Sequence, residues 1–267
     1  MQDDETLRLY TEESVEHLTD IENDLLAIED AGADIDEELV NKVFRAAHTI
    51  KGGAGFMGLN KIKELSHNME NVLDLIRQRE LVPNPEIVNI LLLASDSLRE
   101  LLINVGSSNE AVISEHVDAL IIITQSSLPD KEQQDVSDKV DLSFPDERAV
   151  FTVTKYYISS ARKKGKFIYL VDYDLIHDVQ QKDKAPNDIL KKMEESGVIL
   201  DCKVDIMAVG SLEDDAISNR IPFLVLYATI LDSKMINVLL DIDESQIFVV
   251  DKDFTIRSIS ESHDIES

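Results

Sequence analysis

The sequence predicts two parts of different class: an N-terminal α-helical part, and a C-terminal α+β part in the form of a small ferredoxin-like α/β sandwich. Three observations support this prediction. Through residues 1–128, apolar residues recur at spacings of three and four, as on one face of a helix. Five such segments with short connections are typical of an up-and-down bundle. Over residues 148–258, runs with strand composition alternate with two helical segments, which indicates a sheet with one face covered by helices.

The early helices of the bundle are delimited by their caps. The first helix is broken by "DAGADID". Asp34, with Glu37 three residues later, predicts a variant capping box for the second helix. Asn60 is expected to cap the third helix.

The fourth helix is expected from about Glu86 to Val105, because Asn84 is a good cap and Pro85 a good first helical residue. A fifth helix follows "GSSN" and ends near Pro129. The polar and acidic segment 129–147 has almost no apolar periodicity, which predicts a linker.

The second part is expected to hold strands at "AVFTVTKYYI", "KFIYLVDYDLI", "VILDCKVDIM", "IPFLVLYATIL" and "SQIFVVD". The first two would be joined by a solvated hairpin loop that contains the basic run "ARKKGK". "NDILKKMEESG" and "DSKMINVLLDI" predict helices, the latter capped by Asp232 or Ser233. A disordered tail is expected over residues 259–267.

The composition restricts the classes of function. The 267 residues carry a formal net charge of −27, which argues against nucleic acid as a partner because its phosphates would be repelled. The acidic start of the chain does not resemble a signal peptide, and the longest apolar runs are too short to span a bilayer. Cys202 is the single cysteine, so no disulfide framework is possible. We therefore expect a cytoplasmic protein without a membrane partner, in which Cys202 is a core residue.

The stretch "FRAAHTIKGGAGFMGL", residues 44–59, reads as helix although it is rich in glycine. Each glycine inside a helix costs about 1 kcal/mol relative to alanine. His48 lies off the apolar stripe of this helix and is expected on or near its exposed face, with Lys51, Gly52 and Gly55 along the same side. There, glycines would leave room for the backbone of another protein. Gly53 would instead relieve crowding against a neighbouring helix.

The third helix carries His67, Glu70 and Asp74 at positions i, i+3 and i+7, away from its apolar stripe. If it is the antiparallel neighbour of the second helix, Glu70 can accept a hydrogen bond from Nδ1–H of His48. This bond would fix the tautomer and leave Nε2 as a neutral nucleophile for a phosphoryl group. Lys51 could then counter the phosphoryl charge.

Plainer interpretations stay open. A surface histidine is usually only solvated, a lysine such as Lys51 is usually a solvated charge, and His67 with Glu70 is more often a helix-surface pair. The bundle could be a docking surface without phosphoryl transfer. His48, His67 and Glu70 could also form a metal site, although no further ligand is evident.

"FRAAHTIKGGAGFMGL" closely resembles the phosphoacceptor motif of histidine phosphotransfer (HPt) domains, in particular that of the chemotaxis histidine kinase (CheA) family. "LSHNMENVLDLIR", residues 65–77, resembles the companion helix of that family. The resemblance covers roughly residues 3–128 and implies an HPt bundle. It implies that His48 is phosphorylated, that Glu70 orients it, and that Lys51 and His67 support the site. Arg45, Gly52 and Gly55 are expected to contact partners.

The resemblance also implies the reaction. His48 would take a phosphoryl group from ATP through a kinase domain and pass it to an aspartate of a CheY-like or CheB-like receiver. We find no glycine-rich nucleotide-binding box, so we expect no cofactor and no autonomous kinase activity in this chain, with ATP and Mg²⁺ on partner domains. Whether the chain is the phosphoacceptor segment of a longer kinase or a free-standing phosphotransfer protein stays open.

The segment 223–250, after "LKKMEESG", resembles the CheA domain that docks response regulators, but by pattern rather than by motif. The expected N-terminal hairpin of this part and the stretch around "MAVGSLEDDAISNR" are longer than usual in that family. A docking domain and a spacer or interaction domain of another kind are therefore both open. We assign no role to His17, His116, His177 or His263.

Overall fold

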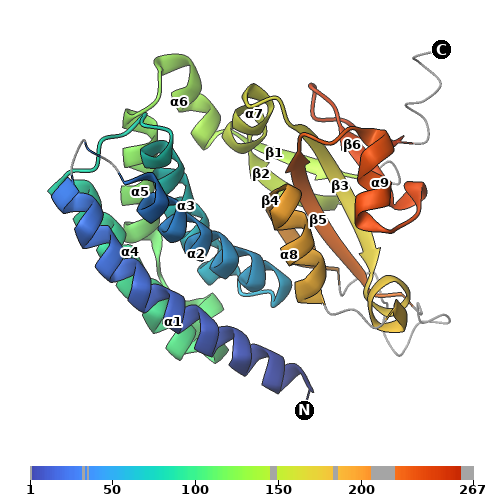
Figure 1. Ribbon diagram of the computed structural model, residues 1–267, viewed down its shortest axis with the longest axis horizontal. Helices are drawn as coiled ribbons and strands as arrows, with labels where there is room; N and C mark the ends of the chain where they lie inside the picture. Colours follow the sequence, from blue (N-terminus) through green and yellow to red (C-terminus); the bar gives the residue numbers. More distant parts are fainter. Residues whose placement is uncertain are drawn as a thin grey trace. The chain divides into compact units, whose positions relative to one another are not determined.

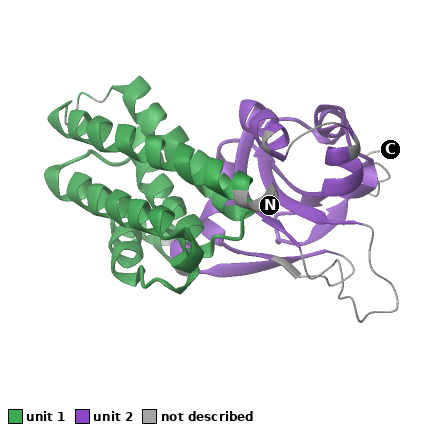
Figure 2. Ribbon diagram, turned by 90° about the horizontal axis from the view of Figure 1, so that it is seen from below, with its two compact units in different colours: residues 1–134 green, residues 135–267 purple. Residues whose placement is uncertain are grey.

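The computed structural model describes residues 2–31, 34, 36–144, 149–182, 186–205 and 220–259. The chain divides into two compact units, residues 1–134 and 135–267 (Figure 2). Each unit has its own apolar core. Most of "MAVGSLEDDAISNR" and all but one residue of the expected disordered tail lie outside the described residues.

The first unit is a helical bundle, as the sequence predicts (Figure 1). Its core is built from leucine, isoleucine, valine and methionine side chains of α1 to α5, which pack at helical spacing. The fourth helix ends at Ile103 rather than at the expected Val105, and a short 3₁₀-helix, η1, follows it. The helices are α1 (Gln2–Ala31), α2 (Glu37–Phe56), α3 (Asn60–Arg77), α4 (Pro85–Ile103), η1 (Val105–Glu110), α5 (Ser114–Ser126) and α6 (Asp130–Ser137).

Two of the three caps expected in the bundle differ in the structure, whereas Asp232 caps α9 (Ser233–Leu240) of the second unit as expected. Asp36, not Asp34, caps α2: its carboxylate accepts hydrogen bonds from the amides of Glu38, at 3.0 Å, and Leu39, at 3.3 Å. A cap must stand directly before the helix to reach the amides of the second and third helical residues, which Asp34 does not. Asn60 is the first residue of α3 rather than its cap.

The cap of α4 is confirmed. Asn84 accepts a hydrogen bond from the amide of Ile87 at 2.9 Å, and Pro85 occupies the first helical position. Proline suits this position because its missing amide proton would have no partner inside the helix.

The acidic segment 129–147 does not remain a structureless linker where the structure describes it. It contains α6 and strand β1 (Lys139–Ser143), which pairs antiparallel with β2 (Ala149–Thr154). Leu142 of β1 is buried, and Val140 packs partly buried against the same core. This alternation of apolar residues is the strand signal, and the many acidic residues around it obscure it.

The prediction of a hairpin between β2 and the next strand is also wrong. The chain passes directly from β2 into helix α7 (Lys155–Lys163), so "KYYISSARK" is helical and not strand and loop. Ile158 and Ala161 of α7 face the core, three residues apart. Arg162 is not simply solvated, because it donates a hydrogen bond to the carbonyl of Val250 at 2.9 Å.

The central sheet of the second unit has five described strands, all antiparallel, in the order β4-β5-β3-β6-β7. Its first four strands and two helices follow each other as β3-α8-β4-β5-α9-β6, which is the ferredoxin-like arrangement. The short strand β7 extends the sheet beyond the prediction. The elements are β3 (Phe167–Asp174), α8 (Pro186–Ser196), β4 (Gly197–Val204), β5 (Pro222–Thr229), α9 (Ser233–Leu240), β6 (Ile247–Val250) and β7 (Ile256–Ser258).

Both faces of this sheet are covered, whereas the sequence predicts a cover of helices on one face only. On one face the hydroxyl of Tyr173 donates to the carbonyl of Leu240 in α9, and Tyr227 to that of Met193 in α8. On the other face, side chains of β3 and β5 share a core with β1, β2 and α7 (Figure 1). The two-sided burial explains why β3 and β5 are nearly continuous apolar runs instead of alternating ones.

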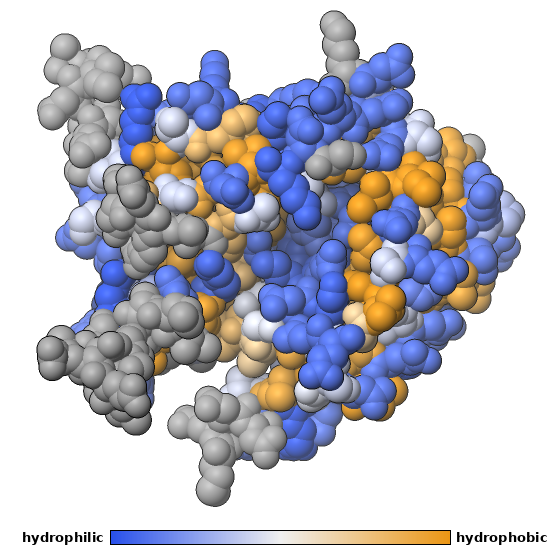
Figure 3. Space-filling model, turned by 180° about the vertical axis from the view of Figure 1, so that it is seen from behind, coloured by the Kyte–Doolittle hydropathy of each residue, from blue (hydrophilic) through white to orange (hydrophobic). Residues whose placement is uncertain are grey.

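Large apolar side chains also reach the surface, and orange residues adjoin one another on the face that Figure 3 draws. They include Ile103, Val112 and Ile122 in the first unit, and Ile230 and Val238 in the second. Apolar atoms contribute more than half of the accessible surface of a typical folded protein, so exposed apolar residues are not by themselves a sign of a site. In the described part of the chain, no helix is both long enough and apolar enough to cross a membrane.

The cap of α2 gives a direct test of the start of this helix. Replacement Asp36→Ala removes the carboxylate that accepts the two amides and should lower the free energy of unfolding by about 1 kcal/mol. Asp34→Ala, in the same loop, should change it by less than about 0.5 kcal/mol. Urea unfolding followed by circular dichroism measures both, and equal effects would contradict the assignment of the cap.

Candidate functional site

The helix pair α2 and α3 brings the candidate residues together. After α2 ends at Phe56, Gly58 adopts a φ of 68°, a left-handed conformation that glycine accommodates readily. The chain then returns alongside α2 as α3, and the two helices pack closely. His48 and Lys51 from α2 therefore face Glu70 from α3.

One carboxylate joins the three side chains. Glu70 Oε1 lies 2.9 Å from Nδ1 of His48, and its Oε2 lies 2.8 Å from Nζ of Lys51. The first contact is the one that the spacing of the two motifs predicts. Glu70 thus bridges an imidazole and an ammonium group that lie one turn apart on α2.

The burial of the site differs from the expectation of an exposed histidine. His48 is 7% exposed, Lys51 4% and Glu70 7%. Gly52 and Gly55 are buried as well. The apolar stripe of α2 is only part of its buried surface, because α3 packs along the side that carries His48. Burial of these charges is tolerable because they pair with each other.

The pKa of Glu70 determines which partner carries the proton in the contact with His48. Burial alone would raise the pKa of Glu70, but the charges of Lys51 and His48 and the hydrogen bond from His48 together lower it below its ordinary range. Glu70 is therefore a carboxylate and can only accept hydrogen bonds, so Nδ1 of His48 must be the donor.

His67 belongs to the same electrostatic cluster. Burial, and after it the charge of Lys51, lowers the pKa of His67 to about 3. The imidazole of His67 is therefore neutral at physiological pH. Asp74, one turn beyond Glu70, forms an ion pair with Arg77.

The structure explains one of the glycines of α2, Gly53. A Cβ atom on Gly53 would lie 2.3 Å from Cε2 of Tyr10, so the ring of Tyr10 in α1 occupies the space of a side chain. The hydroxyl of Tyr10 donates a hydrogen bond to the carbonyl of Ile50 at 2.9 Å. The expectation that Gly53 relieves crowding against a neighbouring helix is confirmed. The expectation that Gly52 and Gly55 leave room for a partner stays a prediction.

Arg45 lies apart from this cluster. Its side chain is exposed and lines a hollow between α1 and α2, together with Lys42, His17 and Asp20. A role of Arg45 in partner contact stays a prediction. Among the described residues, no group of three or more histidine, cysteine, aspartate and glutamate side chains could hold a metal ion, so the metal alternative has no support there.

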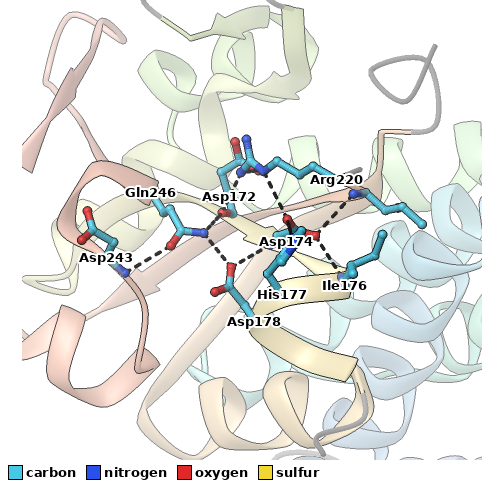
Figure 4. A network of polar contacts seen from close by, with 9 residues as sticks. Asp172, Asp174, Ile176, His177, Asp178, Arg220, Asp243 and Gln246 are labelled. Carbon is cyan, nitrogen blue, oxygen red and sulfur yellow. Dashed lines mark hydrogen bonds and ion pairs between the residues drawn. The ribbon is translucent and has the colours of Figure 1, made fainter. Parts of the chain in front are cut away.

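A second polar cluster, in the second unit, escaped the sequence analysis (Figure 4). It lies at the end of β3, where Asp174 accepts hydrogen bonds from Nδ1 of His177 and from the amides of Ile176, at 2.9 Å, and Ile221. Burial alone would raise the pKa of Asp174, but these hydrogen bonds lower it. The signal in the sequence was "DYD", two aspartates on one side of an otherwise apolar strand.

The rest of this cluster ties neighbouring strands together. Arg220, just before β5, forms an ion pair with Asp172 at 2.8 Å. Gln246, just before β6, donates to the carboxylate of Asp178 at 2.7 Å and to the carbonyl of Asp172 at 2.9 Å. These contacts fix the end of β3 to the starts of β5 and β6, which is a structural role. Cys202, 2% exposed in β4, is a core residue as expected.

The first unit is thus a helical bundle in which a buried histidine, His48, contacts a buried carboxylate, that of Glu70. Residues 5–108 match the model of the Hpt domain family.

Part of this chain is similar to known chemotaxis proteins. A chemotaxis protein CheA of Rhizobium meliloti is 39% identical over 97 residues, 36% of this chain and 12% of the relative. A sensor histidine kinase CheAY of Helicobacter pylori is 36% identical over 125 residues, 43% of this chain and 15% of the relative. The chain thus spans only a small fraction of the length of these curated relatives. The phosphorylated P1 domain of CheA3 from R. sphaeroides, solved in complex with CheY6, is 32% identical, with 46% of this chain and 94% of that chain covered and a TM-score of 0.39.

Replacement of Gly53 tests the contact with Tyr10. Although alanine favours helices by about 1 kcal/mol over glycine, Gly53→Ala should lower the free energy of unfolding by about 1–3 kcal/mol because the methyl group overlaps the tyrosine ring. Gly106→Ala is the control, since a Cβ atom there meets nothing within 4 Å. If urea unfolding shows Gly53→Ala to be as stable as the wild-type chain, the packing role is wrong.

The low pKa of His67 predicts a pH dependence of stability. The unfolded chain binds a proton on this histidine near pH 6.5, whereas the folded chain does so only near pH 3. Between these values the unfolded state holds more protons, so the free energy of unfolding falls as the pH falls. His67→Gln should therefore lose less melting temperature between pH 7 and pH 4.5 than the wild type. His116→Gln, outside the cluster, should follow the wild type; equal slopes for all three chains would contradict the lowered pKa of His67.

Proposed function

We propose that the first unit is a histidine phosphotransfer module of the chemotaxis type. His48 takes a phosphoryl group from ATP bound to a CheA-type kinase domain and passes it to an aspartate of a CheY-like or CheB-like receiver. The observation that carries this proposal is the contact of Nδ1 of His48 with the carboxylate of Glu70, at 2.9 Å. A cytoplasmic location fits this reaction, because its donor is ATP.

The contact with Glu70 prepares His48 as a nucleophile. Since Nδ1 donates its proton to the carboxylate, the lone pair of the neutral imidazole lies on Nε2. Nε2 attacks the γ-phosphorus of ATP, the N–P bond forms, and the bond to the leaving oxygen of ADP breaks. The ring then carries positive charge, which the buried carboxylate of Glu70 stabilises.

The second transfer reverses the first. A carboxylate oxygen of the receiver attacks the phosphorus, the N–P bond breaks, and the electron pair returns to Nε2 of His48. No proton has to leave Nδ1 in either step, so Glu70 can hold the same hydrogen bond throughout. This makes the site suited to two successive partners.

Lys51 has two roles in this proposal. Its ammonium group pairs with Oε2 of Glu70 at 2.8 Å, which keeps the carboxylate ionised and in place. It also lies one turn from His48 on α2, where its charge can attract the phosphoryl oxygens. His67, neutral at physiological pH, adds no charge that would oppose the ring during transfer.

ATP and Mg²⁺ belong, in this proposal, to the kinase domain and not to the described part of this chain. For the second unit we propose that it holds the receiver near His48, as the pattern of its sequence suggests. Tethering of this kind raises the effective concentration of a partner to about the millimolar range for a short linker. The alternative is that the second unit is a spacer without a receiver site. Measuring whether a receiver binds to residues 135–267 alone distinguishes a docking unit from a spacer.

Labelling with γ-³²P-ATP tests the central assignment. A CheA-type kinase domain is supplied together with the chain, and acid-labile label on the chain is measured. His48→Gln should remove the label, whereas His116→Gln should retain it. Glu70→Gln should keep the label but slow its appearance by about 10- to 100-fold, because the carboxylate charge that supports the ring is lost.

Undiminished labelling of His48→Gln would overturn the proposal. A chain that binds the receiver with normal affinity but takes up no label, under conditions in which a known HPt domain is labelled, would instead indicate a docking module without transfer.

A further inference from the structure

We infer that Phe44 and Arg77 are positioning residues, which together hold the plane of the His48 imidazole ring. This inference rests on the proposed function of His48 and deepens it. Neither residue carries a group that could react with the phosphoryl, and both act through the ring of His48.

Phe44 lies one turn before His48 on α2 and is buried, with 8% of its surface exposed. Its ring and the imidazole are close to parallel: the interplanar angle is 16°, and the ring centroids are 6.0 Å apart. These values correspond to offset stacking of two rings. The imidazole therefore lies against a flat, apolar neighbour.

Arg77, in the last turn of α3, holds Phe44 in turn. Its Cζ atom lies 3.9 Å from the centroid of the Phe44 ring, within the range of a cation–π contact. The guanidinium is oriented by an ion pair with Asp74, and Gln78 donates to the other oxygen of the same carboxylate. This gives a function to Asp74, which the sequence places one turn beyond Glu70 on α3.

The two contacts of His48 restrict different motions. A hydrogen bond from Nδ1 to Glu70 fixes the position of one ring atom, but the ring can still rock about the axis of that bond. A ring stacked near one face opposes this rocking. The lone pair of Nε2 lies in the ring plane, so the direction from which it attacks phosphorus depends on that plane. Transfer rates are sensitive to such alignment.

A plain structural role is the alternative. Arg77 and Asp74 are three residues apart on a helix, and half-exposed pairs of this kind contribute little to stability. Loss of Arg77 would then change the stability of the bundle slightly and leave the chemistry of His48 unchanged. The test must therefore separate the behaviour of the ring from stability.

Arg99 offers a matched control in the same unit. Its side chain is 27% exposed, against 30% for Arg77, and it also forms an ion pair, with Glu22 of α1. The partners of its guanidinium group are Glu22 and Thr19, both on α1. Arg77→Gln and Arg99→Gln in the full chain remove comparable guanidinium groups, but only the first touches the stacked rings.

Two measurements are compared for these variants and the wild type. The first is the rate at which His48 accepts phosphoryl from a saturating, supplied kinase domain. The second is the ¹³C relaxation of the His48 ring, by NMR, without any phosphoryl donor. Arg77→Gln should slow the first by about three- to tenfold and increase ring motion, and Arg77→Lys, which keeps a cation, should restore part of both. Arg99→Gln should match the wild type in both.

Phe44→Leu, which keeps apolar volume but removes the ring, should act in the same direction, and its combination with Arg77→Gln should be no slower than Phe44→Leu alone. If Arg77→Gln and Arg99→Gln give equal rates and equal ring relaxation, the inference is wrong, although His48 can still be the acceptor. If His48→Gln remains labelled, the proposed function fails, and the relaxation measurement alone then decides whether Arg77 orders the ring.

Discussion

The carboxylate of Glu70 is the group on which the rest of the first unit depends. It lies between an imidazole and an ammonium group, each within 3 Å, and all three side chains are nearly excluded from water. A buried carboxylate is stable only when its charge and its hydrogen-bonding capacity are satisfied. The close packing of α2 on α3 is therefore required by chemistry as well as by the apolar core, and the protonation of His48 follows from it.

Much of this could be predicted from the sequence, because the information is local. The helices follow from apolar spacing, and the cap of α4 from the adjacent pair Asn84 and Pro85. The contact of His48 with Glu70 needed one assumption, that α2 and α3 are antiparallel neighbours. Its burial was not predictable in this way, because the exposed side of a single helix depends on what packs against it.

The errors in the second unit have a common physical cause. Valine, phenylalanine, threonine and tyrosine around residues 151–157 favour strands, yet α7 begins at Lys155, because strand propensity depends on packing more than on the backbone. Strand β1 was hidden by its acidic neighbours. The cluster at the end of β3 was missed because its members come from three segments, and only "DYD" marked it locally. At Gly53, by contrast, the sequence analysis correctly expected crowding against a neighbouring helix. The ring that occupies the space of a side chain there belongs to Tyr10, forty-three residues earlier.

The central claim is that Glu70 fixes the tautomer of His48 before any partner arrives. Long-range ¹H–¹⁵N correlation spectra of the histidine rings in the unphosphorylated chain, recorded just above neutral pH, measure this directly. We expect His48 to carry its proton on Nδ1, with Nε2 unprotonated, and we expect Glu70→Ala to abolish this preference. A proton on Nε2 in the wild-type chain, or a spectrum that Glu70→Ala leaves unchanged, would contradict the account.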